Sequence, residues 1–167
     1  ALLHKAGIRI IIVPGTRNSI DAQLKAWDLE TDFYNGVRLT SEEALPLVEQ
    51  ASLGVAQRIM SHLTASGLSG IQGNWILARS MGVINGVDYM RTGRIERIQR
   101  DLLEQLMDEK FVPIIPPIGW NKIGHAYNIS STELATELCK YLKVGKLFFI
   151  GSESGIKLEG LVTGKNT

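Results

Sequence analysis

A run of apolar, mostly β-branched residues near the N-terminus constrains the fold most strongly. Residues 8–13 are Ile-Arg-Ile-Ile-Ile-Val, and the run stops at Pro14-Gly15. A short run of this kind, with little polar alternation, is typical of a strand covered on both faces. A helix is predicted over 18–27, and its apolar face would consist of Ile20, Leu24 and Trp27. A buried strand followed directly by an amphipathic helix favours an α/β fold.

The rest of the chain continues this alternation. Thr40 and Glu43 have capping-box spacing and predict a helix that opens at Thr40, with a possible kink at Pro46. Ser130 and Glu133 have the same spacing and predict a helix through residue 142. Further predicted elements are a helix over 98–107, strands at 74–78, 112–118 and 146–150, and hairpins or a long loop over 80–97. The last strand is expected to be buried, and nothing regular is expected after residue 151. The fold class that follows is α/β with a mainly parallel sheet.

Composition limits the kind of protein and its partners. The chain has 167 residues, 44% of them hydrophobic, which is one domain of ordinary size or a large piece of one. A net charge of +1 predicts no nucleic-acid partner, and no apolar run approaches the roughly 18 residues of a membrane span. The single cysteine, Cys139, excludes an internal disulfide and favours a reducing, cytoplasmic location. Because the sequence begins without Met or a signal-peptide pattern, we expect a fragment of a larger protein.

In an open parallel sheet, the ligand-binding site is expected beyond the carboxyl ends of the strands. Three such ends are predicted, at residues 14–18, 117–128 and 151–155. The first leads directly into a helix, whose free amides could hold an anion. An ordinary strand-to-helix turn explains the same residues, because no dinucleotide fingerprint or P-loop pattern is present.

Few individual side chains suggest a role. Arg38 follows the Asn35-Gly36 turn and could offer a bidentate fork to a carboxylate, although a solvated surface arginine fits equally well. Asn128 could orient a ligand or stabilise a turn. The histidines, His4, His62 and His125, have no neighbours in sequence that would complete a triad, and Cys139 fits a packed apolar role. The sequence thus predicts a ligand-binding sheet edge with no catalytic residues and no metal site.

Several segments resemble the amino-acid-kinase family, over about residues 2–158. They are the segment 7–13 followed by Gly15-Thr16-Arg17 and Ile20-Asp21; residues 34–40, similar to the family's Asn-Gly-x-Arg-x-Thr motif; residues 115–119 with 127–129 and 135–136; and residues 146–155. The resemblance implies a three-layer sandwich with a mainly parallel sheet. Residues 1–167 would be part of that domain, with its first strand expected before Ala1 and its second half after Thr167.

Two branches of the family are similar to this chain, the acetylglutamate kinases and the kinase-like domains of N-acetylglutamate synthases. The kinases have a glycine triplet where this chain has Gly15-Thr16-Arg17, and the added side chains would hinder close approach to a phosphate. The kinases also have an aspartate at the position of Thr132. The run 86–98 resembles the synthases instead. These departures favour the synthase branch.

The synthase resemblance implies a regulatory domain. Such enzymes transfer an acetyl group from acetyl-CoA to L-glutamate, the first step of arginine biosynthesis, in a separate acetyltransferase domain that residues 1–167 do not contain. L-arginine as feedback effector, L-glutamate or N-acetylglutamate as ligands, and a homo-oligomer are implied for the intact protein. No cofactor is expected in this segment. The implied ligand-binding residues are Gly15, Arg17, Arg38 and Asn128.

Two other interpretations remain open at this point. A divergent acetylglutamate kinase fragment would need phosphate-binding glycines and a catalytic lysine and aspartate. A free-standing amino-acid-binding module would need no further domain.

Overall fold

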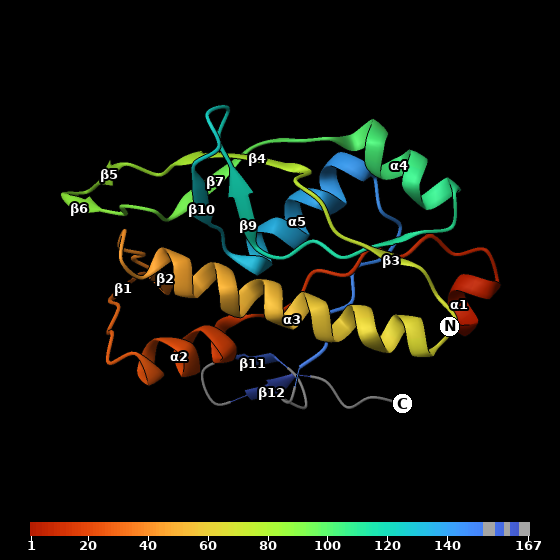
Figure 1. The fold of residues 1–167 in the computed structure, drawn as a ribbon, viewed down its shortest axis with the longest axis horizontal. Coiled ribbons are helices and arrows are strands. Elements are labelled where there is room, and N and C mark those ends of the chain that lie inside the picture. Colours follow the sequence, from red (N-terminus) through yellow and green to blue (C-terminus); the bar gives the residue numbers. More distant parts are fainter. Residues whose placement is uncertain (152–155, 159–160, 164–167) are drawn as a thin grey trace.

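The computed structural model describes residues 1–151, 156–158 and 161–163 (Figure 1). The helices are α1 (Leu2–Lys5), α2 (Arg17–Ala26), α3 (Leu45–Ala65), α4 (Arg100–Asp108) and α5 (Ser131–Leu142). The strands are β1 (Phe33–Tyr34), β2 (Val37–Arg38), β3 (Gly70–Ile71), β4 (Ile76–Ser80), β5 (Val83–Ile84), β6 (Val87–Asp88), β7 (Gly93–Ile98), β8 (Val112–Pro113), β9 (Ile118–Trp120), β10 (Ala126–Asn128), β11 (Ile156–Leu158) and β12 (Leu161–Thr163). None of the helices in the described ranges is long and apolar enough to cross a bilayer.

A four-stranded sheet with helices on both faces organises the molecule (Figure 1). The strand order is β10-β9-β4-β7, with β4 parallel to β9 and antiparallel to β7, and with β9 and β10 forming an antiparallel pair. One core cluster joins this sheet to α4 and α5 through Leu103, Leu134 and Leu138. A second joins β9 and β10 to α2 and α3 through Ile20 and Val48. The α/β class is therefore confirmed, and the sheet itself is mixed.

In addition to this sheet, the fold contains shorter parallel pairings. β3 lies parallel to β8, and Ile12 forms an isolated parallel bridge to Ile114. Backbone hydrogen bonds from the Ile12 amide to the Pro113 carbonyl (2.9 Å) and from the Ile115 amide to the Ile12 carbonyl (2.8 Å) make that bridge. Parallel and antiparallel pairing thus both occur in the fold. The mostly apolar patterns of the strands did not show in advance which strands would pair in which direction.

The strands predicted at 8–13 and 146–150 are wrong as buried strands. Ile12 alone pairs with a neighbour, and Ile8 is 49% exposed. Phe149 is 68% exposed and Ile150 98% exposed, with no strand assigned. An apolar run indicates that its side chains favour a β-sheet. Burial of the strand on both faces also needs neighbouring strands and covering helices. Those neighbours are not present in the described part of the chain.

Other local predictions were partly wrong. The helix predicted to open at Thr40 begins at Leu45 instead, because the Ser41 hydroxyl accepts from the Ala44 amide while Thr40 is engaged elsewhere. Pro46 lies in the first turn of α3, where no hydrogen bond is lost. Trp27, predicted on the apolar face of α2, is 65% exposed because the helix ends before it. The segment after residue 151, expected to be irregular, contains the antiparallel pair β11–β12.

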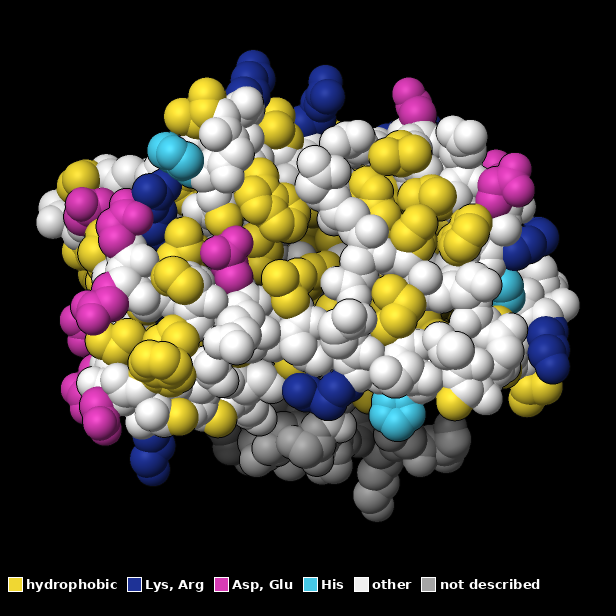
Figure 2. Space-filling view, viewed as in Figure 1, with side chains coloured by type: hydrophobic (Ala, Val, Ile, Leu, Met, Phe, Trp, Pro, Cys, Tyr) yellow, Lys and Arg dark blue, Asp and Glu magenta, His cyan; other side chains and the backbone are white. Residues whose placement is uncertain are grey.

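The turn at Asn35-Gly36 and the cap at Ser130 were predicted correctly. Asn35 and Gly36 both have positive φ, 49° and 77°, as a two-residue hairpin between β1 and β2 requires. The Ser130 hydroxyl accepts from the Glu133 amide at 3.3 Å, which confirms the predicted start of α5. The glycine-rich stretch forms the hairpin β5–β6 and leads into β7. Acidic side chains gather along the left edge of the molecule, from the β5–β6 hairpin down to α2 (Figure 2).

Candidate ligand-binding site

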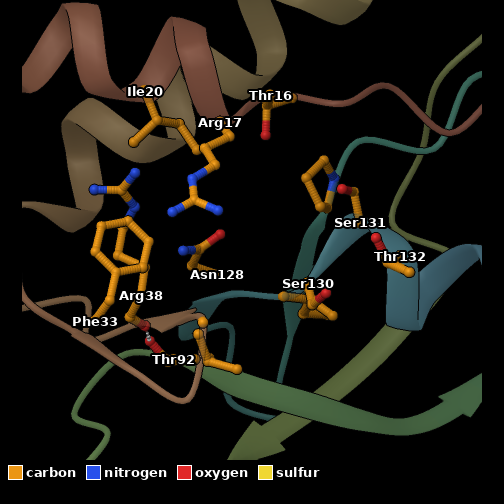
Figure 3. Close-up of a pocket in the computed structure, with 14 residues that line it drawn as sticks. Thr16, Arg17, Ile20, Phe33, Arg38, Thr92, Asn128, Ser130, Ser131 and Thr132 are labelled. Atoms are coloured by element: carbon orange, nitrogen blue, oxygen red, sulfur yellow. Dashed lines mark hydrogen bonds between the residues drawn. The ribbon is translucent and has the colours of Figure 1, made fainter. Parts of the chain in front are cut away.

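A cavity of about 210 Å³ lies where the starts of α2 and α5 meet the β1–β2 hairpin and the end of β10 (Figure 3). Its lining residues are Thr16, Arg17, Ile20, Phe33, Gly36, Val37, Arg38, Thr92, Pro117, Asn128, Ile129, Ser130, Ser131 and Thr132. Pro117 and Asn128 belong to the second of the three strand ends singled out in the sequence, and Arg17 belongs to the first. The fold therefore brings these two strand ends together.

Three of the four predicted site residues line the cavity. Arg17, Arg38 and Asn128 come from α2, β2 and β10, and they meet although more than 100 residues separate the first from the last. Gly15 precedes the start of α2 and does not line the cavity. A Cβ at Gly15 would meet open space, and its φ lies outside the left-handed region. Nothing in the backbone at this position requires a glycine.

Arg38 is buried and already engaged. Only 8% of the residue is exposed, and its guanidinium donates to the Thr31 hydroxyl and to the Asp21 carboxylate. Asp21 lies on α2, so this ion pair fastens the hairpin to the helix. A buried guanidinium needs such partners, because an unpaired charge out of water is costly.

Phe33, which sequence reasoning did not single out, lies against both arginines. The Cζ atoms of Arg17 and Arg38 are each 4.5 Å from the centre of its ring. At this distance a guanidinium is attracted to the negative face of an aromatic ring. The signal in the sequence was weak, because an aromatic residue beside a hairpin turn is usually explained by strand packing.

A buried polar network supports the floor of the cavity. The Asn128 side-chain amide donates to the Thr40 hydroxyl at 3.0 Å, and the Thr92 hydroxyl lies 3.1 Å from that of Thr40. Thr92 also donates to the Arg38 carbonyl at 2.5 Å and accepts from the Thr40 amide at 3.0 Å. This network explains why Thr40 is fully buried rather than capping α3. It links the hairpin, the start of β7 and the end of β10.

Two helix N-termini face the cavity. Thr16 is the N-cap residue of α2, and Ser130 is the N-cap residue of α5, followed by Ser131 and Thr132 (Figure 3). The first amides of a helix have no partner within the helix and carry a partial positive charge. In the first turn of α5, burial and the neighbouring Glu137 raise the pKa of Glu133. Glu133 itself does not line the cavity.

The charge of the site favours an anion. The described lining residues include two arginines and no aspartate or glutamate. Asp21 neutralises Arg38, whereas Arg17 has no ion-pair partner among the described residues. Together with the helix N-termini, Arg17 leaves a positive excess that suits a carboxylate.

The remaining sequence candidates lie elsewhere. His125 is exposed, and its backbone amide donates to the Asn121 side chain. His4 and His62 lie on α1 and α3, away from the cavity lining. Burial raises the pKa of the Cys139 thiol on α5, as expected for a packed cysteine. In the described part of the chain, no group of three metal-ligating side chains comes together.

Comparisons with known proteins place these features in a family. The model of the amino acid kinase family matches residues 1–159. The amino-acid acetyltransferase of Escherichia coli K12 is 35% identical over 164 residues, covering 93% of this chain and 37% of the relative. The chain therefore spans little more than a third of the length of such curated relatives.

Solved structures give the same picture. N-acetylglutamate synthase from Neisseria gonorrhoeae, complexed with coenzyme A and N-acetyl-glutamate, has a TM-score of 0.87 at 26% identity, covering 95% of this chain and 37% of that one. The same enzyme complexed with coenzyme A and L-arginine has a TM-score of 0.86 at 26% identity, covering 95% of this chain and 39% of that one. From the family match and the shared architecture, the chain belongs to the amino acid kinase family.

Proposed function

We propose that this chain is part of the regulatory, kinase-like domain of an N-acetylglutamate synthase and that its cavity binds a small carboxylate. The observation that carries the binding proposal is the cavity's charge. One guanidinium without a described carboxylate partner and two helix N-termini face a space with no acidic side chain in its described lining. The synthase branch is supported by the acetyltransferase relatives and by the synthase structures.

The proposal assigns the intact protein a wider role. It would transfer an acetyl group from acetyl-CoA to L-glutamate, with the catalytic residues outside residues 1–167. L-arginine would be its feedback effector, L-glutamate or N-acetylglutamate would be its small-molecule ligands, and the protein would be a homo-oligomer. A cytoplasmic location belongs to the same proposal, supported by the single cysteine of the sequence. The synthase structures from Neisseria gonorrhoeae, complexed with coenzyme A and either N-acetyl-glutamate or L-arginine, support this choice of ligands.

Of the residues Gly15, Arg17, Arg38 and Asn128, we propose Arg17 and Asn128 as the side chains that contact the ligand. Arg17 and Asn128 have side chains on the cavity, and Arg38 forms its wall beside Phe33. Gly15 would contribute only through its backbone near the start of α2. The lining contains neither a lysine nor an acidic group in the described residues.

The test uses the intact gene product. Glutamate and acetyl-CoA are added, release of free thiol is followed, and L-arginine is titrated. Thiol release that arginine suppresses is the expected result. ADP formation from ATP and N-acetylglutamate, without thiol release, would overturn the proposal in favour of a divergent kinase.

A further inference from the structure

Two guanidinium groups share the Phe33 ring, but their surroundings differ. Arg38 is buried and bonded to two partners, whereas Arg17 is exposed on the cavity side. We propose that Arg17 is the cation that meets the carboxylate of the ligand, that Phe33 is the residue that positions it, and that Arg38 is a structural part of the wall. The proposal rests on the proposed function of the cavity as a carboxylate site.

Arg38 has little left to offer a ligand. One terminal nitrogen donates to Thr31 and the other to Asp21, and the ring of Phe33 covers a face of the guanidinium. To bind a carboxylate through its fork, Arg38 would have to leave Asp21 and detach the hairpin from α2. Its backbone carbonyl is also held, by the Thr92 hydroxyl. These contacts fix the position of the hairpin, which carries Phe33 on its other strand.

Arg17 has the opposite character. It is the first residue of α2, it lines the cavity, and no described side chain accepts a hydrogen bond from its guanidinium. A long exposed side chain of this kind normally samples many rotamers, and ordering it costs free energy when a ligand binds. Stacking on Phe33, with its Cζ 4.5 Å from the ring centre, restricts the guanidinium before any ligand arrives.

The ligand chemistry follows from what lies near Arg17. Its guanidinium reaches toward the Asn128 side chain, and the N-terminus of α5 stands across the cavity (Figure 3). A planar carboxylate can accept two parallel hydrogen bonds from a guanidinium fork. Because the cavity is smaller than those that hold drug-sized molecules, the ligand class is a small carboxylate, for which L-glutamate and N-acetyl-L-glutamate of the proposed function are the probes.

The test measures binding of N-acetyl-L-glutamate and, separately, L-glutamate to the intact protein by calorimetry. Arg17→Met is expected to remove the pocket's binding component or weaken it about tenfold or more, since charged hydrogen bonds are lost. Phe33→Leu is expected to weaken the same component about two- to fivefold, and Phe33→Tyr to retain it, since only the aromatic ring attracts the guanidinium. Melting temperature should be unchanged in Arg17→Met and lowered in Arg38→Met.

The double variant separates positioning from simple destabilisation. If Phe33 acts through Arg17, Phe33→Leu adds nothing once Arg17 has been replaced by Met. Additive losses, or equal affinities for Phe33→Leu and Phe33→Tyr, would overturn the positioning role while leaving the carboxylate site intact. Unchanged binding of both ligands in Arg17→Met would overturn the proposed carboxylate site itself. Affinity lost in Arg38→Met at an unchanged melting temperature would overturn the structural role of Arg38.

Discussion

Replacing Thr92 with valine tests whether the buried network supports the site. Valine has nearly the shape of threonine but no hydroxyl, so the change removes hydrogen bonds without opening space. The Arg38 carbonyl would lose the donor that lies 2.5 Å away, and the Thr40 amide would lose its acceptor at 3.0 Å. Thr92 and Thr40 are 2% and 0% exposed, so water cannot replace the missing hydroxyl.

The size of the effect follows from counting these two groups. A buried donor or acceptor left without a partner costs about 1–3 kcal/mol. Thr92→Val should therefore lower the free energy of unfolding by about 2–6 kcal/mol, which corresponds to a fall in melting temperature of about 4–24 °C for a domain of this size. Thr92→Ser keeps the hydroxyl and loses one methyl group, at a cost of about 1 kcal/mol.

Urea denaturation of the three proteins, followed by circular dichroism, measures the difference. The order expected is wild type, then Thr92→Ser, then Thr92→Val. The affinity for N-acetyl-L-glutamate should fall in the same order, because the network fixes both the hairpin strand of Arg38 and the side chain of Asn128. A valine variant at least as stable as the serine variant would refute the reasoning, since the hydroxyl would then contribute nothing that the methyl group does not.

Three further substitutions test separate contacts. Ser130→Ala removes the hydroxyl that accepts from the Glu133 amide and should cost about 1 kcal/mol in thermal denaturation, with Ser130→Thr as the control. Gly119→Ala would place a methyl group 2.6 Å from the Cβ of Ala78, so overpacking should cost about 1–3 kcal/mol in the same assay; unchanged stability would contradict the close packing of β9 on β4. Burial raises the pKa of Glu49, so stability falls as pH rises through its ordinary pKa toward the raised folded value. Glu49→Gln should thus raise the melting temperature at pH 7 and leave it unchanged at pH 3, and a gain that persists at pH 3 would exclude this origin.

The parts of the fold that could be predicted are those that depend on neighbours in sequence. The Asn35-Gly36 turn specifies a hairpin because both residues tolerate positive φ, and the cap at Ser130 depends on an amide three residues away. The resemblance to the amino-acid-kinase family added the prediction of which residues would form one ligand-binding site. Arg17, Arg38 and Asn128 do line one cavity, although their role as ligand contacts remains a proposal.

The parts that could not be predicted depend on distant contacts. Thr40 has the spacing of a helix cap, but its hydroxyl accepts a hydrogen bond from the Asn128 side chain, 88 residues further along the chain. Its amide donates to the Thr92 hydroxyl, 52 residues further along. The apolar run at 146–150 has the composition of a buried strand and is exposed, because a strand is buried only by elements outside itself. Phe33 gave only a weak signal in the sequence, since its importance lies in two arginines that the hairpin and α2 bring together.

Thr16 and Arg17 stand where the acetylglutamate kinases have glycines, and this difference has two consequences for the site. Glycines at the start of a helix let a bulky phosphate approach the backbone amides. Here Thr16 is 3% exposed and lines the cavity, so its side chain adds bulk at the start of α2, while the guanidinium of Arg17 stacks on Phe33. A fold that accommodates a transferable phosphate in some members of a family can in this way keep its anion preference while losing the room for phosphoryl transfer. Binding without chemistry is what the proposed regulatory role requires, and the bulk and charge of these two adjacent side chains support that proposal.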